Sequence, residues 1–373
     1  MFIKDIELYN YRNYPFAKAE FSEGVNIICG PNGQGKTNLL EAVTFLACGR
    51  AFRTRKDAVT VRFDCDSAYI RGTVCDNDGF DEIEAKLFTQ PRRKQIFING
   101  VKQKTLSSLA GRFGTVLFCP DDLYIAREGA SQRRAFLDNA IEQLRPRYAA
   151  AMHEYSKLLD HKTRILRDWP DKPSLLDTLD EFSLRMAHWG AVIISYRASY
   201  IEKLKAIAKN IHSDISVGKE ELELSYKTVS TVSDALAPIE ELRSKLEEHY
   251  FMRKQAEIDS RSCLSGPHKD DILIDINGRD IKNYGSQGQV RSAVLSMKLG
   301  ERQMYENDTG SCPVLLLDDV LSELDSARQD YILSGIHSGQ VLITCCTQSE
   351  QLSGLDARVF DISNGTVSLR EEN

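Results

Sequence analysis

Apolar and polar residues alternate along much of the first 125 residues, which predicts β-strands. The dipeptide Asn99-Gly100 is a hairpin-turn signal within this region. One predicted helix, Thr37–Ala47, interrupts the strands. The predicted strands cover residues 2–8, 16–21, 25–29, 68–75, 82–88, 94–98 and 115–118.

From Ser131 to about Ser260 the period changes, because apolar residues recur at intervals of three and four positions. This spacing places them on one face of a helix. Pro170 and Pro173 break the helical segment, since proline cannot continue a helix. The stretch ELELSY, residues 221–226, has the alternation of a strand. We therefore predict a mainly helical region that contains a short strand.

After Gly266 strands and helices alternate again, and the last predicted strands are VLITCC, ARVFDI and TVSLR. This order predicts one α/β unit that is split by an insertion, not two domains in series. We assign residues 1–125 and 263–373 to the α/β head and residues 126–262 to an inserted, mainly α-helical arm domain.

Composition places the chain among globular proteins of the cytoplasm. It is 42% hydrophobic and 27% charged, and its longest apolar runs are far shorter than a membrane span. The first ten residues read as a strand and lack the apolar region of a signal peptide. The nine cysteines include no CxxC pair, so we expect no disulfide or zinc framework. The short apolar runs predict no membrane partner.

The net charge of −6 argues mildly against a nucleic-acid partner, but basic residues are clustered. RAFRTRK has four basic residues in seven, and Arg127–Arg167 has nine Lys or Arg against five Asp or Glu. Such runs are most often solvated faces. The alternative is contact with DNA phosphates. The DNA-binding candidates are Arg50, Arg53, Arg55, Lys56, Arg133 and Arg134.

The stretch VNIICGPNGQGKTNLLEAV predicts a strand, a glycine loop and a helix, and it fits the pattern GxxxxGK[ST]. Backbone N–H groups of such a loop wrap phosphates at the helix N-terminus. Lys36 would reach the β- and γ-phosphates, and Thr37 would bind Mg²⁺. We therefore predict that ATP and Mg²⁺ bind here, and a chance glycine turn is the alternative. The ATP-binding candidates in this loop are Gly30, Pro31, Asn32, Gly33, Gln34, Gly35, Lys36, Thr37 and Asn38.

A second motif, which is acidic, completes the predicted nucleotide site. Val314–Leu317 is a continuous apolar run, as expected for a strand that is buried on both faces, and it ends at Asp318-Asp319. By itself the pair could be a helix-capping turn. Together with the loop, it predicts Asp318 as a Mg²⁺ ligand and Asp319, with Lys36, as a catalytic residue that positions the attacking water. Aspartate is shorter than the more usual glutamate, so we expect slow hydrolysis.

The stretch YGSQGQ precedes a predicted helix and resembles the signature motif of ABC-type ATPases. In those proteins the motif faces the γ-phosphate bound by the other subunit, since a helix N-terminus with a serine hydroxyl is an anion site. The resemblance implies an ABC-type P-loop ATPase head with a mixed β-sheet and an ATP-dependent homodimer. The candidates for this contact are Ser286, Gln287, Gly288 and Gln289.

Further motifs extend the resemblance along the whole chain. They are LYNYRNY (8–14), GPNGQGKTNLLEAV (30–43), GRAFRT (49–54), CPDDLYIAREGASQRRAFLD (119–138), GPHKDD (266–271), YGSQGQ (284–289) and LLLDDVLSELD (315–325). With these motifs the chain resembles the RecF family of bacterial recombination-mediator ATPases. Lys269 and Cys119 are small departures from the family pattern.

Membership of that family would imply an ATP-dependent DNA-binding protein of recombinational repair and replication restart. Its expected partners are double-stranded and gapped DNA, RecO and RecR, with which it helps to load the recombinase. Weak, DNA-stimulated ATP hydrolysis would release the dimer. Arg12 and Asn13 match positions that help to hold the phosphates in SMC-like heads. The resemblance leaves open the roles of Asp121, Asp122 and Thr347, at the places of the switch loops.

Two other functions remain as alternatives. An SMC-type structural DNA tether would need hundreds of heptad residues, whereas the insertion offers about 137 that are broken by prolines. A transporter-type ATPase would need the switch histidine, which is absent near Thr347, and would gain nothing from a basic cluster.

Overall fold

The computed structural model describes residues 1–373 except 55, 77–78, 336–337, 348–351, 353 and 371–373. The chain forms two compact units, one from residues 1–123 and 294–373 and the other from residues 124–293. Helix α8 (Gln287–Thr309) includes the boundary between residues 293 and 294, so it belongs partly to each unit.

This division differs from the sequence assignment at residues 124–125 and, above all, at residues 263–293, which belong to the second unit. The physical reason is a strand pairing that periodicity does not reveal. Strand β10 (Asp271–Ile276) pairs antiparallel with β9 (Leu222–Lys227), which lies within the insertion. The segment after Gly266 therefore completes the small sheet of the second unit.

The first unit contains an antiparallel sheet of six strands in the order β2-β1-β4-β5-β6-β7. Asn99 and Gly100 join β6 to β7 with φ values of 50° and 75°, as the hairpin signal predicts. The strands are β1 (Phe2–Tyr11), β2 (Tyr14–Glu20), β4 (Ser67–Asp76), β5 (Gly79–Thr89), β6 (Arg92–Ile98) and β7 (Val101–Lys102).

A second sheet in the same unit has the order β15-β14-β3-β13-β12-β8, in which β15 alone is antiparallel to its neighbour. Since the carboxyl ends of parallel strands meet at one edge, this order brings together the segments that follow β3, β12 and β13. The strands are β3 (Val25–Cys29), β8 (Thr115–Phe118), β12 (Val314–Asp318), β13 (Val341–Cys345), β14 (Ala357–Ser363) and β15 (Thr366–Leu369).

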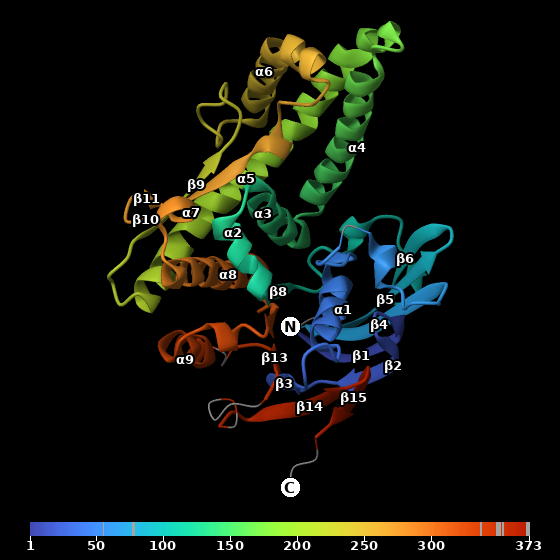
Figure 1. The fold of residues 1–373 in the computed structure, drawn as a ribbon, viewed down its shortest axis with the longest axis vertical. Helices are drawn as coiled ribbons and strands as arrows, with labels where there is room; N and C mark the ends of the chain where they lie inside the picture. Colours follow the sequence, from blue (N-terminus) through green and yellow to red (C-terminus); the bar gives the residue numbers. More distant parts are fainter. Residues whose placement is uncertain (55, 77–78, 336–337, 348–351, 353, 371–373) are drawn as a thin grey trace. The chain divides into compact units, whose positions relative to one another are not determined.

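Helix α1 (Lys36–Cys48) is almost entirely enclosed, with every residue from Leu39 to Ala47 buried. A helix without a polar face requires apolar partners all round. It contacts strands of both sheets, including β4 and β12, and Figure 1 shows it beside the antiparallel sheet. The core of the first unit therefore surrounds the helix that follows the glycine loop. Shorter helices of this unit are η1 (Asp57–Thr60), η2 (Leu106–Leu109), η3 (Pro120–Leu123), η6 (Leu321–Glu323) and α9 (Ser326–Ser334).

The second unit is mainly helical, as predicted for the insertion. Its longest helix, α5 (Leu179–Ile215), packs against α4 (Pro146–Asp168), α6 (Ile239–Ser260) and β9, and Figure 1 shows α4 and α6 on either side of it. The predicted proline break separates α4 from α5. The other elements are α2 (Tyr124–Arg127), α3 (Ala130–Leu144), η4 (Pro173–Thr178), η5 (Pro267–Lys269), β11 (Arg279–Asp280) and α7 (Ile281–Tyr284).

A buried arginine joins α5 to α3 and to η5. The guanidinium of Arg197 on α5 is 2% exposed and donates hydrogen bonds to Asp138, to the carbonyl of Pro267 and to Asp270. A buried charge is tolerated only with such partners. No helix among the described residues combines the length and the apolar character of a membrane span.

Candidate nucleotide site

The glycine loop owes its path to three residues with positive φ. Gly30, Gly33 and Gly35 have φ values of 154°, 79° and 122°, which residues with a side chain rarely adopt. A Cβ on Gly30 would lie 2.3 Å from the carbonyl oxygen of Ile362, and one on Gly35 would lie 2.8 Å from Oη of Tyr14. Both conformation and space therefore require glycine at these two positions.

Lys36 lies inside this loop. Its side chain is 4% exposed, and Nζ donates a 2.8 Å hydrogen bond to the carbonyl of Gly30. Nζ also lies 3.4 Å from Oδ1 of Asn32 and 3.8 Å from Oδ2 of Asp319. The charge of Lys36 is thus held by loop oxygens, at the point where the sequence predicts a phosphate.

The predicted metal ligands come together although 281 positions separate them in the chain. Oγ1 of Thr37 donates to Oδ1 of Asp318 over 3.0 Å, and Oγ1 of Thr344 donates to the same oxygen over 2.8 Å. Burial raises the pKa of Asp318. Hydroxyl and carboxylate oxygens are the ligands that Mg²⁺ prefers, so Thr37 and Asp318 fit this ion. Thr344, at the end of β13, was not predicted.

Asp319 has a left-handed backbone with a φ of 52°. Its N–H donates to Oγ1 of Thr344 over 2.9 Å, which holds this conformation. Its side chain is 33% exposed, so the carboxylate lies at the mouth of the site. Strained non-glycine residues of this kind concentrate at functional sites.

Asn13 contacts the loop, whereas Arg12 does not. Nδ2 of Asn13 donates to the carbonyl of Gln34 over 2.6 Å, and Nδ2 of Asn38 donates to Oδ1 of Asn13 over 2.8 Å. The guanidinium of Arg12 instead forms a bidentate pair with Glu41 of α1, at 2.7 and 2.8 Å. The phosphate role predicted for Arg12 is therefore not supported by its position, and Glu41 is a partner that the sequence did not indicate. Gln34 accepts a hydrogen bond from the backbone N–H of Asn364, and Pro31 continues the loop.

The signature motif forms the start of α8. The N–H of Gln289 donates to Oγ of Ser286 over 3.2 Å, and the N–H of Ser286 donates to Oε1 of Gln289 over 2.9 Å. This reciprocal pair is a capping box. Ser286 and Gln287 are exposed, and Gly288 lies in the first turn. These residues belong to the second unit, whereas the loop and Asp318 belong to the first.

The structure corrects one predicted DNA contact. Arg133 is 8% exposed; its Nε donates to Oδ1 of Asp271 over 2.6 Å, and its Nη1 donates to the carbonyls of Ile125 and Glu128. A side chain held in this way joins α3 to β10 and is not available to DNA. Arg134 is half-buried and donates to the carbonyl of Asp270 over 2.7 Å.

The remaining basic candidates lie after α1. Arg53 is exposed and lies 3.4 Å from Oδ1 of Asn38, and its charge lowers the pKa of Asp318 against the larger effect of burial. Arg53 is therefore beside the nucleotide loop. Lys56 is exposed and Arg50 is half-buried. Arg55 lies outside the described residues.

Asp122, at one of the predicted switch-loop positions, is part of a group of ionisable side chains that includes the buried Lys298 and Glu301. Oδ2 of Asp122 accepts a hydrogen bond from the N–H of Cys119 over 2.8 Å. Lys298 forms a 2.7 Å ion pair with Glu301 and also interacts electrostatically with Asp122. Asp121 and Thr347 are exposed.

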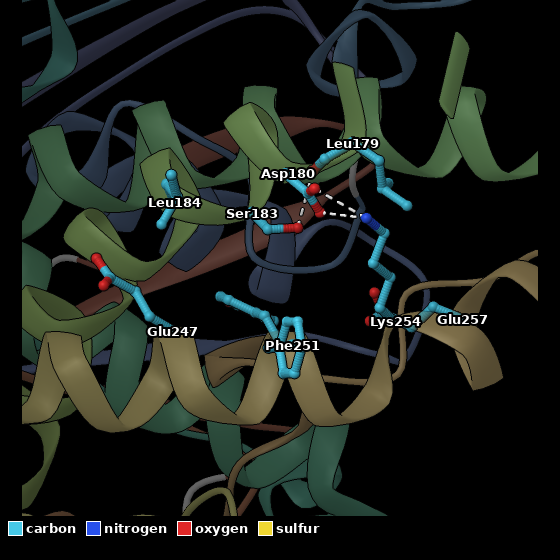
Figure 2. Close-up of a pocket in the computed structure, with 9 residues that line it drawn as sticks. Leu179, Asp180, Ser183, Leu184, Glu247, Phe251, Lys254 and Glu257 are labelled. Atoms are coloured by element: carbon cyan, nitrogen blue, oxygen red, sulfur yellow. Dashed lines mark hydrogen bonds and ion pairs between the residues drawn. The ribbon is translucent and has the colours of Figure 1, made fainter. Parts of the chain in front are cut away.

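The second unit contains a cavity of about 140 Å³ between α5 and α6. Figure 2 shows Lys254 of α6 reaching Asp180 of α5, and Nζ lies 2.7 Å from Oδ1. Leu184 and Phe251 provide apolar walls. None of the predicted nucleotide residues lines this cavity.

Comparison with known proteins gives consistent matches along the whole chain. The family described as RecF/RecN/SMC N terminal domain matches residues 2–365. The chain is 39% identical over 370 residues to the DNA replication and repair protein RecF of Clostridium acetobutylicum, which covers 99% of each protein.

Two solved structures extend this similarity to the fold. The structure of the recombination mediator protein RecF-ATP in RecFOR pathway has a TM-score of 0.91 and 37% identity, and the match covers 99% of this chain and 98% of the other. An SmcHead bound to the C-winged helix domain of ScpA has a TM-score of 0.57 over 99% of this chain and 97% of the other, with 13% identity, and is similar in fold alone. The predicted fold, an ABC-type ATPase head of the SMC kind, is confirmed.

Proposed function

Because this chain belongs to the RecF family, we propose that it is an ATP-dependent DNA-binding protein of DNA replication and recombinational repair, acting in the cytoplasm. The observation that carries the proposal is the convergence of Lys36, Thr37 and Asp318 at the carboxyl edge of the parallel strands. Lys36 holds the β- and γ-phosphates, and the loop glycines admit backbone N–H groups to them. Mg²⁺ held by Thr37 and Asp318 would neutralise phosphate charge.

ATP joins two copies of the chain in this proposal. The exposed N-terminus of α8, with Ser286, binds the γ-phosphate held by a second copy, so each nucleotide stabilises the dimer. The dimer binds double-stranded or gapped DNA and helps RecO and RecR to load the recombinase. Asp319 orients the attacking water, and slow hydrolysis releases the dimer.

DNA titrations with and without ATP test this function, with Lys36→Ala and Asp319→Asn as variants. ATP should tighten DNA binding by the native protein. Lys36→Ala should weaken ATP binding by about 1.5–3 kcal/mol, the value of a charged hydrogen bond. Asp319→Asn should bind ATP without hydrolysing it and remain on DNA.

Hydrolysis by Asp319→Asn at the native rate would remove Asp319 from this role. Equal DNA affinity with and without ATP would favour an SMC-type structural tether. Hydrolysis without any DNA binding would favour a transporter-type ATPase.

A further inference from the structure

Two cysteines end neighbouring strands directly beside the glycine loop. Cys29 is the last residue of β3, and Cys345 is the last residue of β13. They are direct partners in the parallel register, and their Sγ atoms are 3.4 Å apart. Cys346 follows, with its Sγ 3.6 Å from Nζ of Lys36 and 2.9 Å from Oδ1 of Asn32.

The position of the two thiols permits a disulfide. Adjacent strands are about 4.8 Å apart, which is within the Cα separation that a disulfide spans. The sulfur atoms need only to approach from 3.4 Å to about 2.05 Å. Cys29 is buried, but Cys345 beside it is half-buried and the next residue, Cys346, is exposed, so a small oxidant approaches the pair from this edge of the sheet.

The contact between the thiols also prepares one of them for reaction. The hydrogen bond from Cys345 lowers the pKa of Cys29 to about 7, with a smaller contribution from Arg370, and it raises the pKa of Cys345. The thiolate is the reactive form of cysteine. Cys29 is thus the better nucleophile, and Cys345 is the thiol that can resolve its oxidised product.

We propose that Cys29 and Cys345 form an oxidation site through which hydroperoxides act on the nucleotide loop. The Cys29 thiolate attacks the O–O bond of hydrogen peroxide, which leaves a sulfenic acid and, after proton uptake, one water. The sulfur of Cys345 then attacks the sulfenic sulfur. The S–O bond breaks, and hydroxide leaves as a second water with the Cys345 proton. Two thiols are oxidised to one disulfide, and the peroxide is reduced.

The disulfide would act on the loop through Gly30. The N–H of Gly30 donates to the carbonyl of Cys345 over 3.3 Å, and its carbonyl accepts the 2.8 Å hydrogen bond from Lys36. Gly30 has little space to move toward β14, since even a Cβ there would lie 2.3 Å from the carbonyl oxygen of Ile362. A shift of Cys29 therefore displaces the carbonyl that holds Lys36, and ATP binding weakens. This consequence, unlike the oxidation itself, rests on the proposed nucleotide site.

The test combines peptide mapping with ATP binding. The protein is treated with hydrogen peroxide, its free thiols are blocked, and its peptides are analysed by mass spectrometry without reduction. We expect a peptide that links Cys29 to Cys345. We also expect ATP affinity to fall by about tenfold, as for one lost charged hydrogen bond, and to recover with dithiothreitol.

Cys345→Ala is the main variant, because it removes the resolving thiol at a half-buried position and leaves Cys29 in the core. It should retain its ATP affinity under peroxide, as should Cys29→Ser if that variant folds. Cys75→Ser, a half-buried cysteine on β4, is the matched control and should respond like the native protein.

Absence of the linked peptide while other thiols are oxidised would overturn the oxidation site. A linked peptide without a change in ATP affinity would overturn its action on the loop. Failure of the untreated protein to bind ATP would contradict the proposed function instead, and the linked peptide would still decide the oxidation site.

Discussion

At the scale of single residues, exposure separates basic side chains that can meet DNA from those that hold the fold. Arg133 lies in the arginine-rich cluster of the sequence, yet its guanidinium is 8% exposed and paired with Asp271. Lys56 has the same charge and is exposed. Charge patterning shows where basic residues concentrate along the chain. It does not show which of them form an ion pair with a carboxylate from a distant strand.

This difference predicts opposite effects of two alanine substitutions. Lys56→Ala should make the binding constant for duplex DNA less dependent on salt, because one phosphate contact is lost. The magnitude of the slope of log binding constant against log salt concentration should decrease by about 0.9. Arg133→Ala should leave the slope unchanged and lower the free energy of unfolding by about 2 kcal/mol or more, since Asp271 loses its partner. Binding between 50 and 200 mM salt and urea unfolding measure the two effects. A smaller slope for Arg133→Ala would return that residue to the DNA surface.

At the scale of elements, local pattern and long-range pairing contribute differently. Helix α1 was predicted at Thr37–Ala47 and spans Lys36–Cys48, because its apolar residues and its glycine loop are contiguous. The pairing of β10 with β9 was not predictable, since alternation indicates a buried face but not the strand beside it. That pairing moves residues 263–293 into the second unit.

The same distinction applies to the nucleotide site. The loop motif gives Lys36 and Thr37 by spacing alone, and an acidic pair after an apolar run gives Asp318. Thr344 and Glu41 were missed because their roles depend on neighbours across the sheet or around a helix. A polar residue near the end of the apolar run VLITC was the available signal for Thr344.

His268, near the middle of the short helix η5, should make the stability of the protein depend on pH. Burial lowers the pKa of His268 to about 4, and Nδ1 lies 2.8 Å from Oη of Tyr155. The native state keeps this histidine neutral, whereas the unfolded chain takes up a proton below about pH 6.5. The free energy of unfolding should therefore fall by up to about 3 kcal/mol as pH decreases from 6.5 to 4, and this contribution is complete above pH 6.5.

Urea unfolding at pH 7 and pH 5 measures this effect. His268→Gln should have a smaller loss of stability between the two values than the native protein. His153→Gln, which changes an exposed histidine of the same unit, is the control and should retain the native difference. An equal loss in both variants would show that His268 does not cause the dependence.

At the scale of the whole molecule, the proposed dimer assigns different partners to the two anion sites. In this proposal the loop of the first unit would bind its own nucleotide, and the start of α8 would bind the nucleotide of a second copy. Ser286→Arg should therefore bind ATP as a monomer but fail to dimerise, because an arginine cannot fit where a hydroxyl approaches a phosphate oxygen at about 2.7 Å. Loss of the helix cap should cost about 1 kcal/mol of stability in addition.

Sedimentation velocity with ATP, under conditions of slow hydrolysis, measures this dimer. Ser131→Arg, at an exposed serine of the same unit, is the control and should dimerise normally. A dimer of Ser286→Arg as tight as the native one would limit the signature residues to a role in the fold. Loss of ATP binding by the monomer would place them at the chain's own nucleotide.

Helix α1 is buried from Leu39 to Ala47, so it is the centre of the core as well as the base of the glycine loop. A ligand on the first turn of this helix therefore binds the folded core and not the unfolded chain. Thermodynamic linkage then requires ATP to raise the free energy of unfolding of the first unit by RT ln(1 + [L]/Kd), so its melting temperature should rise with ATP concentration. In a thermal scan the nucleotide should act as a stabiliser of the entire unit, and Lys36→Ala should reduce that shift at a given ATP concentration.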